Sequence, residues 1–131
     1  ALDVQFIGDV ALESKEVIDL AGPAAEGFAV LRVGLKNSPA YVNFEKRFKE
    51  IHNQDPTIWA DFAYDSIKLV AEAIKTNGYT PEGIRKFFQE VKNYPGASGP
   101  KTFDEDGIAF GVYDLYRVKD GKFEYWDYAK E

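Results

Sequence analysis

The chain has 131 residues, of which 45% are hydrophobic and 15% aromatic, and its formal net charge at pH 7 is −6. This apolar content suffices for a packed core and argues against disorder. The acidic balance, with no basic patch, argues against nucleic-acid binding. The lack of cysteine excludes disulfides and thiolate chemistry without indicating a compartment. No apolar run reaches the roughly 20 residues of a membrane span, and we expect no signal peptide, because a strand-like segment opens at Ala1.

The N-terminal third predicts a strand, a helix and a second strand. We expect them at Val4–Ile7, Lys15–Ala21 and Gly27–Val33, with Ser14 as the N-cap of the helix, and with Val17, Ile18 and Ala21 facing inward. The second strand is apolar except for Arg32, which is typical of a strand covered on both faces. This order with short links indicates an α/β fold.

The longest helical pattern runs over Pro56–Asn77. Its apolar residues recur at helical spacing: Ala63, Ile67, Val70 and Ile74, widened by Phe62, Leu69 and Ala73. Asp55 is placed as the N-cap, with Pro56 at the first helical position, and Gly78 provides the stop. A stripe of this width needs a sheet or other helices to cover it.

The remaining segments predict two more helices, a loop and a hairpin. One helix follows Ser38-Pro39, with an inward stripe of Tyr41, Phe44, Phe48 and Ile51. The other follows Thr80-Pro81, with Ile84, Phe87, Phe88 and Val91 inward. Gly, Pro, Asn and Asp residues favour a loop at Asn93–Gly107. Strands are expected at Phe110–Val118 and Phe123–Tyr128, joined through Asp120-Gly121 in a type I′ turn.

Motifs that could carry chemistry are weak. The stretch Gly96–Thr102 (GASGPKT) departs from a phosphate loop, because Pro100 separates Gly99 from Lys101 and the order of flanking elements is wrong. Asp104–Asp106 lack the spaced ligands of a calcium loop and favour a plain turn. His52 is the only histidine, so a catalytic triad or zinc site is hard to assemble. We therefore predict no catalytic residues, no metal site and no cofactor.

Several segments, taken in order, resemble the C-terminal portion of type I periplasmic solute-binding proteins of the branched-chain amino acid (leucine/isoleucine/valine) type. They are VQFIGDVALESKEVIDLAGPAAEGFAV, FAYDSIKLVAEAIKTNG, ASGPKTFDEDG and VYDLYRVKDGKF. The resemblance implies a Rossmann-like layered sheet with flanking helices, part of a fold with two α/β lobes around a cleft. Residues 1–131 would be a single α/β unit of such a protein. The chain would cross between lobes near Leu31–Asn37 and return near Tyr113–Val118.

The resemblance also implies site residues. Family members carry an acidic residue after the strand that corresponds to Val4–Ile7, where it pairs with the ligand ammonium. Asp9 is the first candidate and Glu13 the second, although the family position corresponds to Val10 here. The alternative for Asp9 is a purely turn-stabilising role. Tyr64 and Trp59 are candidates for lining the cleft; the alternative for both is ordinary aromatic packing.

The implied function is capture of a small amino acid-like solute without turnover, followed by delivery to an ABC transporter permease, in a periplasmic or other extracytoplasmic location. Two alternatives remain: a ligand-sensing module of a receptor, and a small flavodoxin-like enzyme. The enzyme should have a phosphate-binding turn after its first strand, and the segment from Gly8 to Ala11 lacks the glycines and hydroxyls for it. The isolated chain should leave strand edges and apolar faces uncovered and self-associate, as a dimer.

Overall fold

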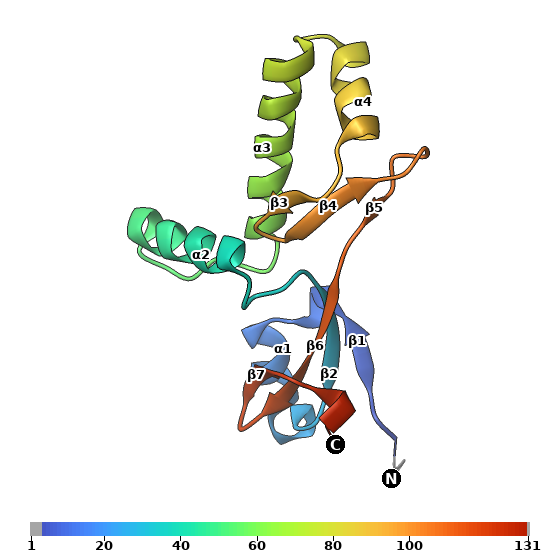
Figure 1. Ribbon diagram of the computed structural model, residues 1–131. Helices are drawn as coiled ribbons and strands as arrows, with labels where there is room; N and C mark the ends of the chain where they lie inside the picture. Colours follow the sequence, from blue (N-terminus) through green and yellow to red (C-terminus); the bar gives the residue numbers. More distant parts are fainter. Residues whose placement is uncertain (1–3, 131) are drawn as a thin grey trace. The chain divides into compact units, whose positions relative to one another are not determined.

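The computed structural model describes residues 4–130, which form two compact units (Figure 1). Residues 4–33 and 113–130 belong to one unit, and residues 34–112 belong to the other. The chain thus changes unit at two points, one within Leu31–Asn37 and one directly before Tyr113–Val118, which are the predicted crossover stretches. That residues 1–131 act as a single α/β unit stays a prediction.

The first unit is built on a mixed four-stranded sheet in the order β1-β2-β6-β7. Its strands are β1 (Ile7–Asp9), β2 (Ala29–Val33), β6 (Tyr113–Lys119) and β7 (Lys122–Tyr125). Its helical segments are the 3-10 turn η1 (Val10–Leu12), α1 (Lys15–Ala21), and the 3-10 turns η2 (Gly22–Ala25) and η3 (Tyr128–Lys130). β1 pairs with β2 in parallel through α1, and the other pairings are antiparallel. The predicted strand–helix–strand order is confirmed.

The bounds of the first strand were wrong. It begins at Ile7 and continues through Gly8 to Asp9, because these residues pair in register with Ala29, Val30 and Leu31 of β2. The predicted Gly8-Asp9 stop therefore lies inside the strand. α1 has the predicted bounds, and the Ser14 hydroxyl accepts a hydrogen bond from the Val17 N–H. Two of the three residues expected to face inward are half-buried, whereas Ala21 is exposed.

The second strand and the C-terminal hairpin also differ in extent. The second strand begins at Ala29 rather than Gly27, and Leu31 is exposed, so one face is only partly covered. The predicted strand Phe110–Val118 divides into two strands of different sheets, because Gly111 and Val112 belong to neither. The final strand ends at Tyr125. The Asp120-Gly121 turn is confirmed: both residues have positive φ, 51° and 71°, as a type I′ turn requires.

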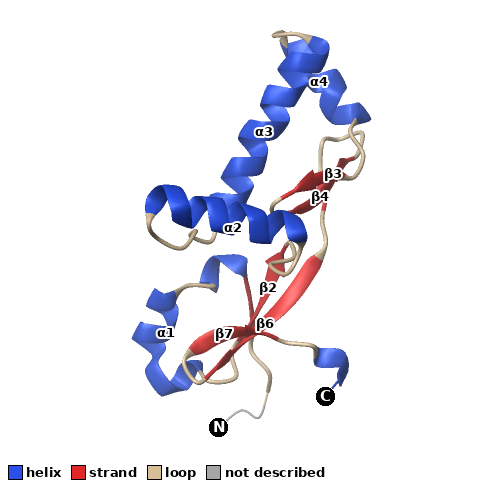
Figure 2. Cartoon of the chain, turned by 60° about the vertical axis from the view of Figure 1, so that its left-hand side comes forward, coloured by secondary structure: helices blue, strands red, loops and turns tan. Residues whose placement is uncertain are grey.

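The second unit consists of three helices and a small antiparallel sheet in the order β3-β4-β5. Its elements are α2 (Pro39–His52), α3 (Ala60–Asn77), α4 (Pro81–Glu90), β3 (Tyr94–Gly96), β4 (Gly99–Phe103) and β5 (Ala109–Phe110). α3 and α4 lie side by side (Figure 2). Ser38 and Thr80 cap α2 and α4 as predicted. The core is made by Tyr41, Phe44 and Ala97, whereas Ile51 of the predicted α2 stripe is exposed.

The start of α3 was predicted four residues too early. The helix begins at Ala60, and its N-cap Trp59 makes no side-chain capping bond. Asp55 precedes that N-cap by four residues, and its carboxylate pairs with Lys49 Nζ at 2.8 Å instead. The predicted stop at Gly78, which has a φ of 86°, is confirmed.

The buried face of α3 includes Leu69 and Ala73 of the predicted stripe but otherwise differs from it. Buried residues recur every four positions, at Asp61, Asp65, Leu69 and Ala73. Ala63, Ile67 and Val70, the centre of the predicted stripe, are exposed. Two aspartates thus face inward, and Asp65 accepts hydrogen bonds from Ala97 and Ser98 there.

The predicted loop Asn93–Gly107 was wrong, since most of it forms the β3–β4 hairpin. Gly and Pro residues concealed this strand pair, which is held by side-chain contacts from α3 rather than by its own apolar alternation. Within residues 4–130, no helix combines the length and apolar character that crossing a membrane would require.

Candidate functional site

Asp9 lies at the end of β1 and caps the turn that follows. Its Oδ1 accepts a hydrogen bond from the Ala11 N–H at 2.7 Å, and the residue is exposed. The capping bond matches the turn-stabilising alternative. An exposed carboxylate at a strand end is also open to a cationic ligand.

Glu13 lies on the other side of η1 and pairs with Arg32 of β2. Its Oε2 is 2.9 Å from Arg32 Nη1, and the Arg32 and Glu13 side chains are 2% and 7% exposed. A buried guanidinium needs a carboxylate of this kind, because an uncompensated buried charge is costly. Glu13 is therefore engaged by an internal cation, which leaves Asp9 as the more accessible carboxylate for a ligand ammonium.

Arg32 itself was missed as a site residue. The available signal was a single charged residue inside an otherwise apolar strand, which implies a buried partner of opposite charge. The sequence offers many acidic residues, so it could not indicate Glu13 as that partner.

Trp59 and Tyr64 lie at the start of α3, in the other unit. Trp59 is half exposed and contacts Phe62 edge-on, with ring centroids 5.6 Å apart. Tyr64 packs on Phe44 at 5.2 Å, and its ring also lines a cavity of about 120 Å³ beside α2. Both aromatic rings thus have packing partners and exposed surface. Asp9 and Glu13 belong to the first unit, and Trp59 and Tyr64 belong to the second.

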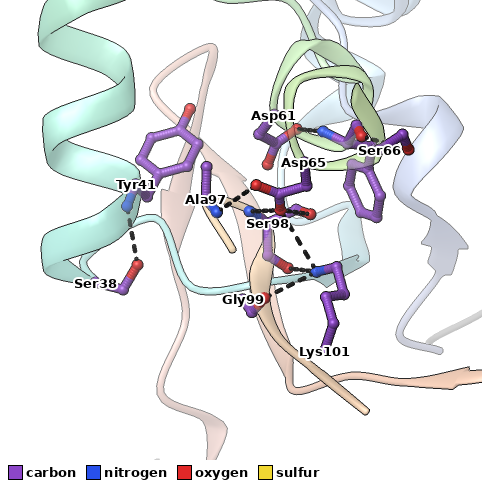
Figure 3. A network of polar contacts seen from close by, with 10 residues as sticks. Ser38, Tyr41, Asp61, Asp65, Ser66, Ala97, Ser98, Gly99 and Lys101 are labelled. Carbon is purple, nitrogen blue, oxygen red and sulfur yellow. Dashed lines mark hydrogen bonds and ion pairs between the residues drawn. The ribbon is translucent and has the colours of Figure 1, made fainter. Parts of the chain in front are cut away.

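A network of polar contacts in the second unit surrounds Asp65 (Figure 3). Asp65 Oδ1 accepts from the Ala97 N–H at 2.7 Å, and Oδ2 accepts from the N–H and hydroxyl of Ser98 at 2.8 and 2.6 Å. These three bonds tie α3 to the turn between β3 and β4. Gly96 is required here, because a Cβ atom would lie 2.4 Å from Asp65 Oδ2.

Lys101 completes this network. Its Nζ donates to the carbonyl oxygens of Ser98 and Gly99 at 2.8 and 2.9 Å and lies 3.7 Å from Asp65 Oδ2. Burial lowers the pKa of Lys101 below its ordinary value, while the negative charges of Asp65 and Asp61 oppose that shift. Two hydrogen bonds of Lys101 thus go to carbonyl oxygens of the hairpin itself, so this lysine braces the hairpin.

The exposed Asp9 carboxylate is suited to binding a ligand, whereas the Glu13–Arg32 pair and the Asp65 network stabilise the fold. Within the described part of the chain, no three histidine or acidic side chains gather closely enough to hold a metal ion. The lone histidine, His52, stacks on Phe48 with centroids 4.4 Å apart.

Comparison with known proteins gives the class. Residues 3–122 match the family model described as periplasmic binding protein. The chain belongs to the periplasmic binding protein family. Over 130 residues it is 26% identical to a Leu/Ile/Val-binding protein homolog 1 of Brucella suis biovar 1 (strain 1330).

Solved structures agree with this family assignment. An ABC transporter substrate-binding protein from Desulfitobacterium hafniense, in complex with Leu, is 27% identical with a TM-score of 0.77; 96% of this chain and 36% of that chain are covered. A leucine binding protein from Thermotoga maritima MSB8 shares the fold with a TM-score of 0.80 at 24% identity, covering 92% of this chain and 35% of that one. The resemblance to the type I periplasmic solute-binding fold is confirmed.

The alignments cover nearly all of this chain but only part of each relative. The alignment to the Brucella suis protein covers 95% of this chain but 35% of the relative. The chain thus spans about a third of the length of the curated relatives it matches.

Proposed function

We propose that this chain is the C-terminal portion of an extracytoplasmic solute-binding protein that captures a small amino acid-like ligand and passes it to an ABC transporter permease. The family match over residues 3–122 carries the proposal. Support comes from a relative named as a Leu/Ile/Val-binding protein homolog and from an ABC transporter substrate-binding protein that was solved in complex with Leu. The ligand would lie in a cleft between two lobes, which closes about a hinge as such proteins do.

Amino acid capture needs a carboxylate for the ammonium, donors for the carboxylate and an apolar wall. In this proposal Asp9 supplies the first of these, because it is exposed at a strand end while Glu13 is occupied by Arg32. Trp59 and Tyr64 keep exposed ring surface and would contribute to the wall. Donors for the ligand carboxylate would come from the part of the protein that precedes this segment.

We expect binding without turnover. Calorimetry on the full-length protein that carries this chain, with a panel of amino acids and small carboxylates, tests both points. Saturable heat with an amino acid, recovered chemically unchanged, supports the proposal. If no compound of the panel gives a binding heat and the protein shows hydrolase or transferase activity, the proposal is contradicted.

Mass spectrometry of co-purifying ligand separates the alternatives. A free amino acid supports solute binding, whereas a flavin or nucleotide would indicate a flavodoxin-like enzyme. A receptor module would bind a ligand too, and it differs in lacking a permease partner; reconstituted transport with the cognate permease decides between them.

A further inference from the structure

The chain passes between the two units at two places, between Val33 and Gly34 and between Val112 and Tyr113. In the first unit, Val33 of β2 lies opposite Tyr113 of β6 in the strand register. In the second unit, the Gly34 N–H donates to the Val112 carbonyl oxygen at 2.8 Å. The two crossing segments are thus hydrogen-bonded to each other, and bending of this chain between its units has to occur at these four residues.

The crossing segments lie against the Ser98-Gly99 corner, where the β3–β4 turn meets β4. Gly34 has a φ of 99°, and a Cβ atom built on it would lie 2.8 Å from the Ser98 carbonyl oxygen. A Cβ atom built on Gly99 would lie 3.3 Å from Val112 Cγ2 and 3.4 Å from the Gly34 Cα atom. The corner therefore touches both segments, and position 34 has room only for glycine.

The corner is itself held firmly within the second unit. Asp65 of α3 accepts hydrogen bonds from the N–H and the hydroxyl of Ser98. Lys101 Nζ donates to the carbonyl oxygens of Ser98 and Gly99, and the first of these is the oxygen that Gly34 approaches. Asp65, Ser98 and Lys101 are all buried. A corner fixed by charged partners on α3 and β4 moves little when a neighbouring segment presses on it.

We propose that the Ser98-Gly99 corner is a fixed stop for the hinge between the two units. It contacts Gly34 on one crossing segment and Val112 on the other, and it sets the angle at which the units rest when no ligand is bound. Gly34 is a positioning residue in this device, because the absence of a Cβ atom lets its segment reach the stop. The inference rests on the proposed function only for the closing of the lobes, since the stop acts in the ligand-free protein.

Distances between two spin labels test the stop in the full-length protein that carries this chain, purified free of ligand. Lys15→Cys and Lys86→Cys place one label on each unit at side chains that are 80% and 67% exposed. Gly34→Ala should shift or broaden the distribution of label distances, because the added methyl group moves the segment off the corner. Gly78→Ala is the matched control: its φ is 86°, nothing lies within 4 Å of its Cβ position, and the distribution should not change. An unchanged distribution in Gly34→Ala, or an equal change in both variants, would overturn the proposal.

Val112→Ala tests the second contact without placing alanine at a positive φ. It removes Cγ2, the atom that lies next to Gly99, so the second segment should lose its support and the label distances should spread. Val42→Ala, at a half-exposed valine of α2, is the control and should leave the distances unchanged. Identical distributions in Val112→Ala and in the unmodified protein would refute the contact of the corner with this segment.

Thermal unfolding of each variant separates a moved hinge from a weakened fold. Gly34→Ala and Gly78→Ala both place alanine at a positive φ and should both lower the unfolding midpoint, whereas only Gly34→Ala should move the label distances. Addition of leucine tests the proposed function separately. If Gly34→Ala moves the resting distances and leucine changes no distance in the unmodified protein, the stop is supported and closure on leucine is contradicted.

Discussion

Asp65 engages both donors of Ser98 with one oxygen: Oδ2 lies 2.8 Å from the Ser98 backbone nitrogen and 2.6 Å from its hydroxyl. The two residues are 33 positions apart and both are buried. Hydrogen bonds to a charged acceptor are stronger than neutral ones, so this carboxylate is a strong link between the helix and the short hairpin.

Replacing Asp65 should therefore destabilise the chain more than replacing Ser98. Asp65→Asn removes the charge and turns one acceptor into a donor that faces backbone N–H groups, for an expected loss of about 2–4 kcal/mol. Ser98→Ala removes only the hydroxyl and should cost about 1 kcal/mol. Urea denaturation curves give both values. A larger loss for Ser98→Ala would show that the carboxylate is not the organising group.

The lowered pKa of Lys101 predicts a pH-dependent stability. Between the folded pKa and the ordinary value of 10.5, the unfolded chain binds more protons than the folded chain, so stability rises with pH through this window. Lys101→Met should be less stable at neutral pH, because two carbonyls lose a donor, and should lack this slope. Denaturation from about pH 7 to about pH 9 stays below most tyrosine ionisation. Lys92→Met, an exposed control, should keep the slope; its loss there would refute the assignment.

Local signals in the sequence predicted much of the fold. Ser14, Ser38 and Thr80 were recognised as caps because a cap depends only on the next three residues. The type I′ turn at Asp120-Gly121 is equally local. The β3–β4 hairpin was missed because the bonds from Asp65 that brace it span more than thirty residues.

The α3 face shows a different limit. Periodicity found an apolar stripe centred on Ile67, but the structure buries Asp61 and Asp65 instead. A hydrophobic pattern assigns aspartates to the exposed face of a helix. It cannot predict a buried aspartate whose hydrogen-bond donors come from a distant part of the chain. For the candidate site, the resemblance directed attention to Asp9 and Glu13. The sequence marks Arg32 as an unusual charge in an apolar strand, but it does not show that Arg32 pairs with Glu13 and so leaves Asp9 as the more accessible carboxylate.

The buried Glu13–Arg32 pair predicts a stability effect in the first unit. Glu13→Gln removes a charged partner of a guanidinium that is 2% exposed, so up to about 3–5 kcal/mol should be lost. Asp19→Asn breaks the exposed Lys15–Asp19 pair on α1 and should cost less than about 1 kcal/mol. Chemical denaturation compares the two. Equal, small losses would show that the buried pair contributes no more than a surface pair.

Asp9→Asn separates ligand binding from turn stability. Asparagine caps a helical turn about as well as aspartate, so the thermal midpoint should hardly change. If Asp9 pairs with a ligand ammonium in the full-length protein, the lost charge pair should weaken binding by at least roughly a hundredfold, measured by calorimetry. An unchanged affinity would assign the ammonium contact to Glu13 or to residues outside this chain.

The exposed face of α3 predicts self-association of the 131-residue chain. Ala63, Ile67 and Val70 fall on one side of the helix, and the Ile67 side chain is 72% exposed. A contiguous apolar stripe of this kind favours contact with a second copy, whereas a single exposed apolar residue does not. Light scattering at about 100 μM should show a dimer that Ile67→Lys shifts to monomer. Leu20→Lys, at an exposed leucine on α1 in the other unit, should leave the dimer intact. If the unmodified chain is a monomer and binds no dye that reports exposed apolar surface, the prediction of self-association through α3 is wrong.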